Sequence, residues 1–396
     1  MRRLGQGAAF WAVAYAFAVV ALGTTLPTPL YGIYREELGF SELTVTVIYA
    51  TYAVGVISGL LLFGRLSDEI GRRRTLLPGI ALSAASAAVF LLAHGLAPLF
   101  LGRLLSGLSI GIFTGTATAA LIDFAGPGQE SRATLGSTFA NLGGLSLGPL
   151  LTGALAEWAP QPLRLTFWAD LALLVPALAC IWALPDGERS RGRFRLRPQR
   201  LHVPVEMRSI FAKAALVGFV GFAVFGSFTG VASAFLPAVL GVDSHFVVGL
   251  VVFLVFASST IGQLMLGDTE PRAAMRRGCA GLVLGLAIIF AALAAESLAL
   301  LIVGGIATGI GQGLGFRAAL FTVNSAAPPE RRAEVASSFF VVAFVGLSLP
   351  VVGIGVLAEM TDLQAAGLVF AAAVAIVSAV ALALLAREGE SRAATG

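Results

Sequence analysis

Three charged side chains interrupt otherwise apolar stretches of this sequence: Arg103, Asp170 and Arg317. A carboxylate in such a stretch can bind and release a proton, and an arginine can hold an anionic group through two parallel hydrogen bonds. We therefore expect Asp170 or the region of Arg103 to sense the proton, with a structural ion pair between Asp170 and Arg164 as the alternative. Arg317, close to Gln312, predicts either an anion site or a gate residue.

Neutral polar side chains mark further positions in the apolar stretches. Tyr49, Tyr52 and Asn141 need hydrogen-bond partners where no water is present, so we expect them to line a cavity. Four phenylalanines between residues 219 and 228 are spaced three apart and wind around a helix, so some of them must face lipid or a neighbouring helix. An apolar cavity with few charges suits lipophilic solutes better than sugars.

The composition defines the solvent in which these residues act. The chain has 396 residues, of which 57% are hydrophobic and 12% charged, and its mean hydropathy is +0.90. Ordinary soluble domains carry about 25% charged and about 45–50% apolar residues. This shortage of polar surface excludes a water-soluble enzyme and a nucleic-acid-binding module, despite the formal net charge of +4.

Apolar windows bounded by charges predict an all-α membrane protein with twelve membrane-spanning helices, because about 20 apolar residues cross a bilayer. The first window is too long for a secretory signal, so we expect an uncleaved first span. The expected spans lie near residues 8–30, 43–63, 75–93, 97–122, 134–157, 164–184, 211–238, 246–266, 278–295, 297–323, 334–357 and 364–386.

Lysine and arginine gather on one side of these spans, and only Arg35 and Arg164 face the other side. The positive-inside rule then places both termini and the long middle loop in the cytoplasm. We expect a six-helix bundle over residues 1–184, a basic linker over 185–210 that carries arginines from Arg189 to Arg200, and a second six-helix bundle with a short cytoplasmic tail over 211–396. The arginines of this linker indicate that it is attracted to anionic lipid headgroups rather than to nucleic acid.

The two halves resemble one another. Arg132-Ala133 followed by Ser137-Thr138-Phe139 recurs 200 residues later as Arg332-Ala333 followed by Ser337-Ser338-Phe339. Gly59 and Gly64 followed by Arg73-Arg74 recur as Gly262 and Gly267 followed by Arg276-Arg277. Matches in corresponding loops indicate an internal duplication. Parallel six-span repeats that rock about a site near the midplane are typical of alternating-access transporters.

The loop from Gly64 to Arg74 resembles the conserved loop of the major facilitator superfamily, with Glu69 in place of the usual basic residue. Gly64 can bring span 2 close to a neighbour, and Gly71 can take a positive φ in the turn. The resemblance implies that Arg72 pairs with Asp123 and that Asp68 meets a cation or helix end near span 11. Such pairs would latch one state and release in the other, whereas a solvated turn that only sets topology is the alternative. The cations near span 11 are Arg331 and Arg332.

Two further patterns resemble the same family. Leu99, Arg103 and Gly107 match its span-4 pattern, which implies a role for Arg103 in proton or substrate coupling; an arginine that reaches the outer headgroups is the alternative. In span 5, a glycine–proline pattern resembles the signature of the family's antiporters and implies export, with ordinary helix packing as the alternative. The residues of this helix-bend pattern are Gly144, Gly148, Pro149 and Gly153.

The resemblance predicts a proton-coupled exporter of a small lipophilic compound. Proton-coupled uptake of a metabolite or organic anion is the alternative, and a membrane sensor or enzyme a more distant one. Ser109 and Ser146 each lie in a G-x-S-x-G pattern, but a serine nucleophile needs a base and we expect glycine packing instead. We expect no cofactor or metal, the proton motive force as energy source, lipid and protons as partners, a monomer, and a bacterial inner membrane.

Overall fold

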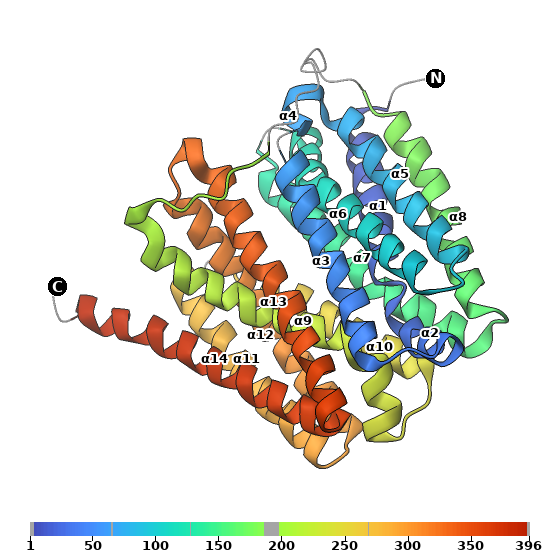
Figure 1. Cartoon of the computed structure of the whole chain (residues 1–396). Coiled ribbons are helices and arrows are strands. Elements are labelled where there is room, and N and C mark those ends of the chain that lie inside the picture. The colour runs from blue at the N-terminus through green and yellow to red at the C-terminus, as the bar shows by residue number, and fades with distance from the viewer. Residues whose placement is uncertain (1–3, 65, 127, 186–197, 268, 394–396) are drawn as a thin grey trace. The chain divides into compact units, whose positions relative to one another are not determined.

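The computed structural model describes residues 4–64, 66–126, 128–185, 198–267 and 269–393, and these residues form helices joined by short connections (Figure 1). Twelve stretches are long and apolar enough to cross a membrane, so the predicted number of spans is confirmed. The arginines at 189, 191, 193, 195 and 197 of the predicted linker lie outside the described residues. The longer helices are α1 (Gln6–Thr25), α3 (Glu42–Phe63), α5 (Arg72–Leu91), α6 (Leu96–Ala125), α7 (Glu130–Trp158), α8 (Pro162–Trp182), α9 (Arg208–Leu240), α10 (His245–Leu264), α11 (Pro271–Ala294), α12 (Leu298–Ala326), α13 (Arg332–Met360) and α14 (Leu363–Ala393).

The first span is longer than the predicted window over residues 8–30. α1 ends at Thr25, a single 3-10 turn follows at Thr28–Leu30, and α2 (Tyr31–Leu38) completes a candidate span of 33 residues. Pro27 and Pro29 cause the interruption, because a proline lacks the backbone N–H that helical hydrogen bonding needs. The break turns the side chains of α2 in a direction that a continuous helix would not give them.

The chain divides into two compact units. Unit 1 comprises Met1–Gly39 and Thr51–Gln199, and unit 2 comprises Phe40–Ala50 and Arg200–Gly396. This division lies close to the predicted bundles, except that the first residues of α3 group with unit 2. A 3-10 turn at Val205–Met207 leads into α9, so helical structure begins inside the predicted linker. α14 continues to Ala393, beyond the predicted span end at residue 386.

Glycines bring neighbouring helices of each unit into close contact. In unit 1 a Cβ on Gly107 or Gly111 of α6 would overlap the backbone oxygens of Tyr52 and Val56 on α3. In unit 2 a Cβ on Gly313 of α12 would likewise overlap a backbone oxygen of α10. The same packing device therefore joins α3 to α6 and α10 to α12, as an internal duplication requires.

A second pair of helices shows the same correspondence. In unit 1 a Cβ on Gly144 of α7 would overlap the backbone oxygen of Ala18 on α1, and in unit 2 a Cβ on Gly346 of α13 would overlap that of Phe219 on α9. Gly144-Leu145-Ser146-Leu147 and Gly346-Leu347-Ser348-Leu349 are identical in sequence. The two units thus share helix order, helix packing and local sequence.

Candidate functional site

Arg103 is the most deeply buried cation among the described residues, with a relative exposure of 1%. It lies two turns into α6, and its Nη1 donates a hydrogen bond of 2.6 Å to the backbone oxygen of Thr24 at the end of α1. That oxygen is available to a side chain because Pro27 and Pro29 end the regular helix shortly after it. Arg103 therefore points into unit 1, and the alternative in which it reaches the outer headgroups is wrong.

Two aromatic rings flank the Arg103 guanidinium. Its Cζ lies 5.0 Å from the ring centre of Tyr52 on α3 and 5.7 Å from that of Tyr31 on α2. Cation–π attraction is stronger in a site without water, so the rings replace part of the solvation that burial removes. Tyr52 was predicted to line a cavity. Tyr31 was not predicted as a site residue, because only the break after α1 aims it at α6.

Asp170 is a buried carboxylate on α8, with a relative exposure of 2%. A Cβ built on Gly23 of α1 would lie 3.0 Å from its Oδ2 and 3.2 Å from its Oδ1, so the carboxylate rests directly on this glycine. Among the described residues, none donates a hydrogen bond to Oδ1. Arg164 is exposed whereas Asp170 is buried, so the structure does not support the alternative of an ion pair between them.

Packing on both sides of α8 turns Asp170 toward α1. The rings of Phe167 on α8 and Phe90 on α5 stack with centres 4.9 Å apart and planes 4° apart. The Tyr15 hydroxyl of α1 donates a hydrogen bond of 3.1 Å to the backbone oxygen of Leu173. Phe167 and Leu173 each lie three residues from Asp170, so these two contacts fix the helix face that carries the carboxylate.

Asp170 and Arg103 therefore contact consecutive residues of one helix. The carboxylate rests on Gly23, and the guanidinium binds the carbonyl group of Thr24. A change of charge at Asp170 would act on the segment of α1 that holds Arg103. The buried Asp170 carboxylate, the buried Arg103 guanidinium and the end of α1 that both contact form the candidate functional site of unit 1.

The predicted loop between spans 2 and 3 is built around Arg72. Gly71 has φ of +99°, a conformation that favours glycine. Arg72 Nε donates to Asp123 Oδ2 at 3.0 Å, and its Nη1 donates to Asp68 Oδ1 at 2.6 Å and to the hydroxyl of Ser67 at 2.7 Å. The structure thus brings together Arg72, Asp68 and Asp123 within unit 1. Ser67 was missed because it carries no charge.

Other predicted latch residues have partners within their own unit. A Cβ on Gly64 would lie 2.6 Å from the side-chain nitrogen of Gln199, so a residue of the predicted linker is its close neighbour. Arg331 Nη1 lies 2.8 Å from His202 Nε2, and Arg332 Nε donates to the backbone oxygen of Asn324 at 3.0 Å. The contact between Asp68 and this cationic pair stays a prediction.

The polar residues predicted for unit 2 hold its helices together. Gln312 is 2% exposed, and its side-chain oxygen accepts a hydrogen bond of 2.6 Å from Ser259 of α10. Arg317 is half-buried and donates from Nη1 to the backbone oxygen of Gln263 at 2.6 Å. The Tyr49 hydroxyl lies within hydrogen-bond distance of the Thr229 hydroxyl on α9.

The predicted helix-bend residues of α7 lie against α1. A Cβ on Gly148 would lie 2.6 Å from the backbone oxygen of Leu22, and Thr25 Oγ1 donates to the backbone oxygen of Leu145 at 3.0 Å. Pro149 lies inside the helix and Gly153 is buried, whereas Asn141 is half-buried on the same helix. These contacts pack the end of α1, which includes Gly23 and Thr24, against α7.

The two serines of the G-x-S-x-G patterns bind backbone oxygens. Ser109 donates to Gly79 of α5 at 2.7 Å, and Ser146 donates to Gly143 at 3.0 Å. Within the described part of the chain, no group of three or more His, Cys, Asp or Glu is placed to hold a metal ion. Ser109 thus binds a neighbouring helix, whereas Ser146 binds the backbone of its own helix.

Comparison with known proteins agrees with this architecture. The family model described as Major Facilitator Superfamily matches residues 13–349. The chain belongs to the Major Facilitator Superfamily. Its relatives include the inner membrane transport protein YajR of Escherichia coli (strain K12), 28% identical over 190 residues, and the quinolone resistance protein NorA of Staphylococcus aureus, 26% identical over 187 residues. Each match covers 46% of this chain and less than half of the relative, 40% of YajR and 47% of NorA.

Two solved structures share the fold. A bacterial homologue of the human lysosomal transporter Spinster gives a TM-score of 0.74 at 15% identity and covers 96% of each chain. A mutant of the nucleoside transporter NupG gives 0.72 at 14% identity over 95% of this chain and 99% of that one. The chain is thus a multi-pass membrane protein of this superfamily.

Proposed function

We propose that this superfamily transporter exports a small lipophilic compound in exchange for protons, as a monomer in a bacterial inner membrane with both termini in the cytoplasm. It works by alternating access, in which the two repeats rock about a substrate site. Its energy source is the proton gradient, without a cofactor. The contact of Asp170 and Arg103 with consecutive residues of α1 carries this proposal.

The coupling follows from what protonation changes at Asp170. A proton added from one side neutralises a carboxylate that rests on Gly23, and its loss restores a charge in an apolar helix packing. The two forms favour different distances between α8 and α1. Because Thr24 holds Arg103 through its carbonyl group, the position of α1 also sets the position of the guanidinium and of the two rings beside it.

The loop at Arg72 supplies the second switching element of the proposal. Arg72 is shared between Asp68 and Asp123 within unit 1. In one state Asp68 also binds the cationic pair Arg331 and Arg332, and in the other state it releases them. Ionic contacts that form and break between two packed arrangements are a common basis of switching.

Export of a lipophilic compound is supported by two observations. The described spans contain few ionisable groups and many aromatic residues, which favours apolar solutes. One relative of the chain is named a quinolone resistance protein. Arg317 favours the rival function, uptake of an organic anion with protons, since a half-buried arginine can bind a carboxylate.

Transport in membrane vesicles tests the proposal. Inverted vesicles with an imposed pH gradient are screened against lipophilic drugs and organic acids, with Asp170→Asn and Asp68→Asn as variants. Drug-dependent proton release by the wild type, lost in Asp170→Asn, supports antiport. Entry of an organic acid together with protons into right-side-out cells supports uptake instead. Full gradient-driven transport by Asp170→Asn would exclude Asp170 as the proton site.

A further inference from the structure

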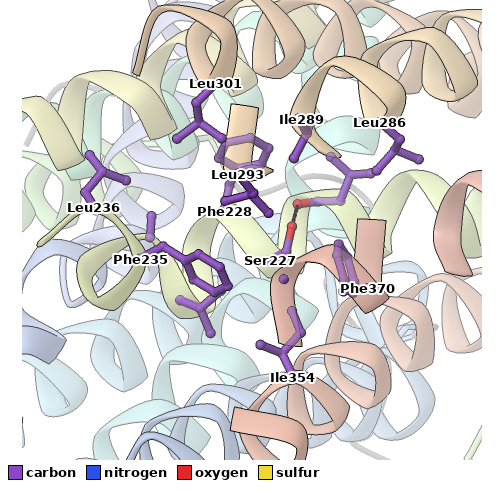
Figure 2. A pocket seen from close by; sticks show the side chains of 14 residues that line it. Ser227, Phe228, Phe235, Leu236, Leu286, Ile289, Leu293, Leu301, Ile354 and Phe370 are labelled. Atoms are coloured by element: carbon purple, nitrogen blue, oxygen red, sulfur yellow. Dashed lines mark hydrogen bonds between the residues drawn. The ribbon is translucent and has the colours of Figure 1, made fainter. Parts of the chain in front are cut away.

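An apolar pocket lies inside unit 2, enclosed by α9, α11, α12, α13 and α14 (Figure 2). The space inside it measures about 50 Å³. Twelve of its fourteen lining residues are buried, and the other two, Ser227 and Phe370, are half-buried. Ser227 is the one polar side chain of the lining, and it donates its hydrogen bond to the backbone oxygen of Val224 at 2.8 Å. The pocket therefore offers a guest no free donor.

The internal duplication explains why unit 2 has this pocket. Buried positions of α8 and α14 match at a spacing of 200 residues, as shown by Thr166 and Ala366 and by Leu174 and Val374. On α5 and α11, the spacing of 203 residues that relates Arg73-Arg74 to Arg276-Arg277 pairs Phe90 with Leu293, and Leu293 lies beside Gly367. Equivalent residues of the two units can therefore be compared one by one.

Unit 2 lacks an aromatic ring that unit 1 contains. In unit 1, Phe167 stacks on Phe90. At the equivalent positions unit 2 has Gly367 and Leu293, and both line the pocket. Phe235 of α9 fills part of this space, since a Cβ on Gly367 would lie 2.7 Å from its Cζ. The rest stays open.

The type of side chain also differs between the two units at a third equivalent position. Asp170 of unit 1 corresponds to Phe370 of unit 2 at the same spacing of 200 residues, and Phe370 lines the pocket. The place that holds a carboxylate in unit 1 thus holds a ring in unit 2. Together with Phe228 and Phe235, it gives the lining three aromatic side chains from two helices. Aromatic rings favour offset-stacked or edge-to-face contact with another ring.

We propose that this pocket binds the uncharged aromatic ring of a lipophilic compound, which takes the place of the missing Phe167 equivalent. Apolar cavities of this kind exclude water and bind apolar guests. A charged or strongly polar group is rejected, because it would lose its hydration and gain no hydrogen bond. Binding here requires neither transport nor a proton gradient.

Photolabelling of the purified full-length protein in detergent tests the inference. The probe is a small aryl trifluoromethyl diazirine, with toluene as competitor and peptide mapping as the readout. We expect saturable labelling of the segment from Val224 to Leu236, blocked by toluene. In Ala232→Phe, where the new ring fills the pocket, this labelling falls about tenfold. The matched control is Ala238→Phe on the exposed side of the same helix, which leaves it unchanged.

Three results would overturn the inference. They are labelling of this segment that does not saturate, labelling that persists in a folded Ala232→Phe protein, and competition by added phospholipid but not by toluene, which would assign the pocket to an acyl chain. If Ala232→Phe unfolds, as judged by its thermal transition, Val231→Leu fills less space and is used in its place. A cationic aryl diazirine should not label the segment, and its labelling would equally contradict an apolar site.

Discussion

The Asp170 carboxylate rests on Gly23, with Oδ2 3.0 Å from the place where any other residue would carry a Cβ. The next residue of α1, Thr24, binds Arg103 through its carbonyl group. The end of α1 therefore contacts both the buried carboxylate and the buried guanidinium of unit 1. Its backbone can pass a displacement from one to the other without a direct ion pair.

Gly23→Ala should impair transport. The added methyl group must push the carboxylate or α1 by a few tenths of an ångström, at a cost of about 1–3 kcal/mol. We expect gradient-driven transport in vesicles to fall about tenfold, as 1.4 kcal/mol of lost coupling requires. Gly143→Ala on α7, where nothing lies within 4 Å of the new Cβ, should transport normally. Equal activity of both variants would show that Asp170 needs no contact with α1.

Arg103→Lys should abolish most transport although the charge is kept. A lysine ammonium is a compact point charge and cannot place a planar group between two rings while it donates to Thr24. We expect transport to fall at least about tenfold, since each 1.4 kcal/mol is a factor of ten. Arg164→Lys, an exposed arginine of the same unit, is the control. An active Arg103→Lys protein would show that transport requires only a positive charge at this position, and not the planar guanidinium.

The sequence was sufficient to predict the spans, the duplication and the buried charges. A segment that crosses the bilayer must be apolar over about 20 residues, so the twelve spans could be predicted from hydropathy without knowledge of helix contacts. Arg72 and Asp123 were paired through the family resemblance, and the structure joins them at 3.0 Å. These features depend on local sequence or on a pattern shared by many chains.

Contacts between distant helices could not be predicted. The approach of Gly23 to Asp170 depends on the rotation of α1 and α8 about their axes, which phenylalanine stacking and a tyrosine hydrogen bond decide. Tyr31 reaches Arg103 only because the chain breaks at two prolines. The pocket of unit 2 likewise requires the alignment of two units by their packing. A pattern of residue types carries no information about such rotations.

Asp123→Asn should change transport with little effect on unfolding. The Asp123 side chain is 52% exposed, and ion pairs of this kind contribute about 0–1 kcal/mol to stability. We expect an almost unchanged thermal transition and transport reduced several-fold, because Arg72 loses one of its two carboxylates. The double variant Arg72→Asp with Asp123→Arg should transport better than the single variant Arg72→Asp, because it restores an opposite-charge pair. Glu69→Gln in the same loop serves as control; if it reduces transport as much, the loop's net charge matters rather than the pair.

Gly107→Ala tests whether helix packing positions the site. Gly107 lies one turn after Arg103 on α6, and its added Cβ would overlap the backbone oxygen of Tyr52. α3 must then move away and take the Tyr52 ring from the guanidinium, so we expect a loss of about 1–3 kcal/mol of stability together with lost transport. Gly115→Ala on the same helix meets nothing within 4 Å and should match or exceed the wild type in thermal stability, because alanine favours a helix over glycine by about 1 kcal/mol. A Gly107→Ala protein that unfolds earlier but transports normally would separate packing from coupling, and would show that Tyr52 does not need to face Arg103.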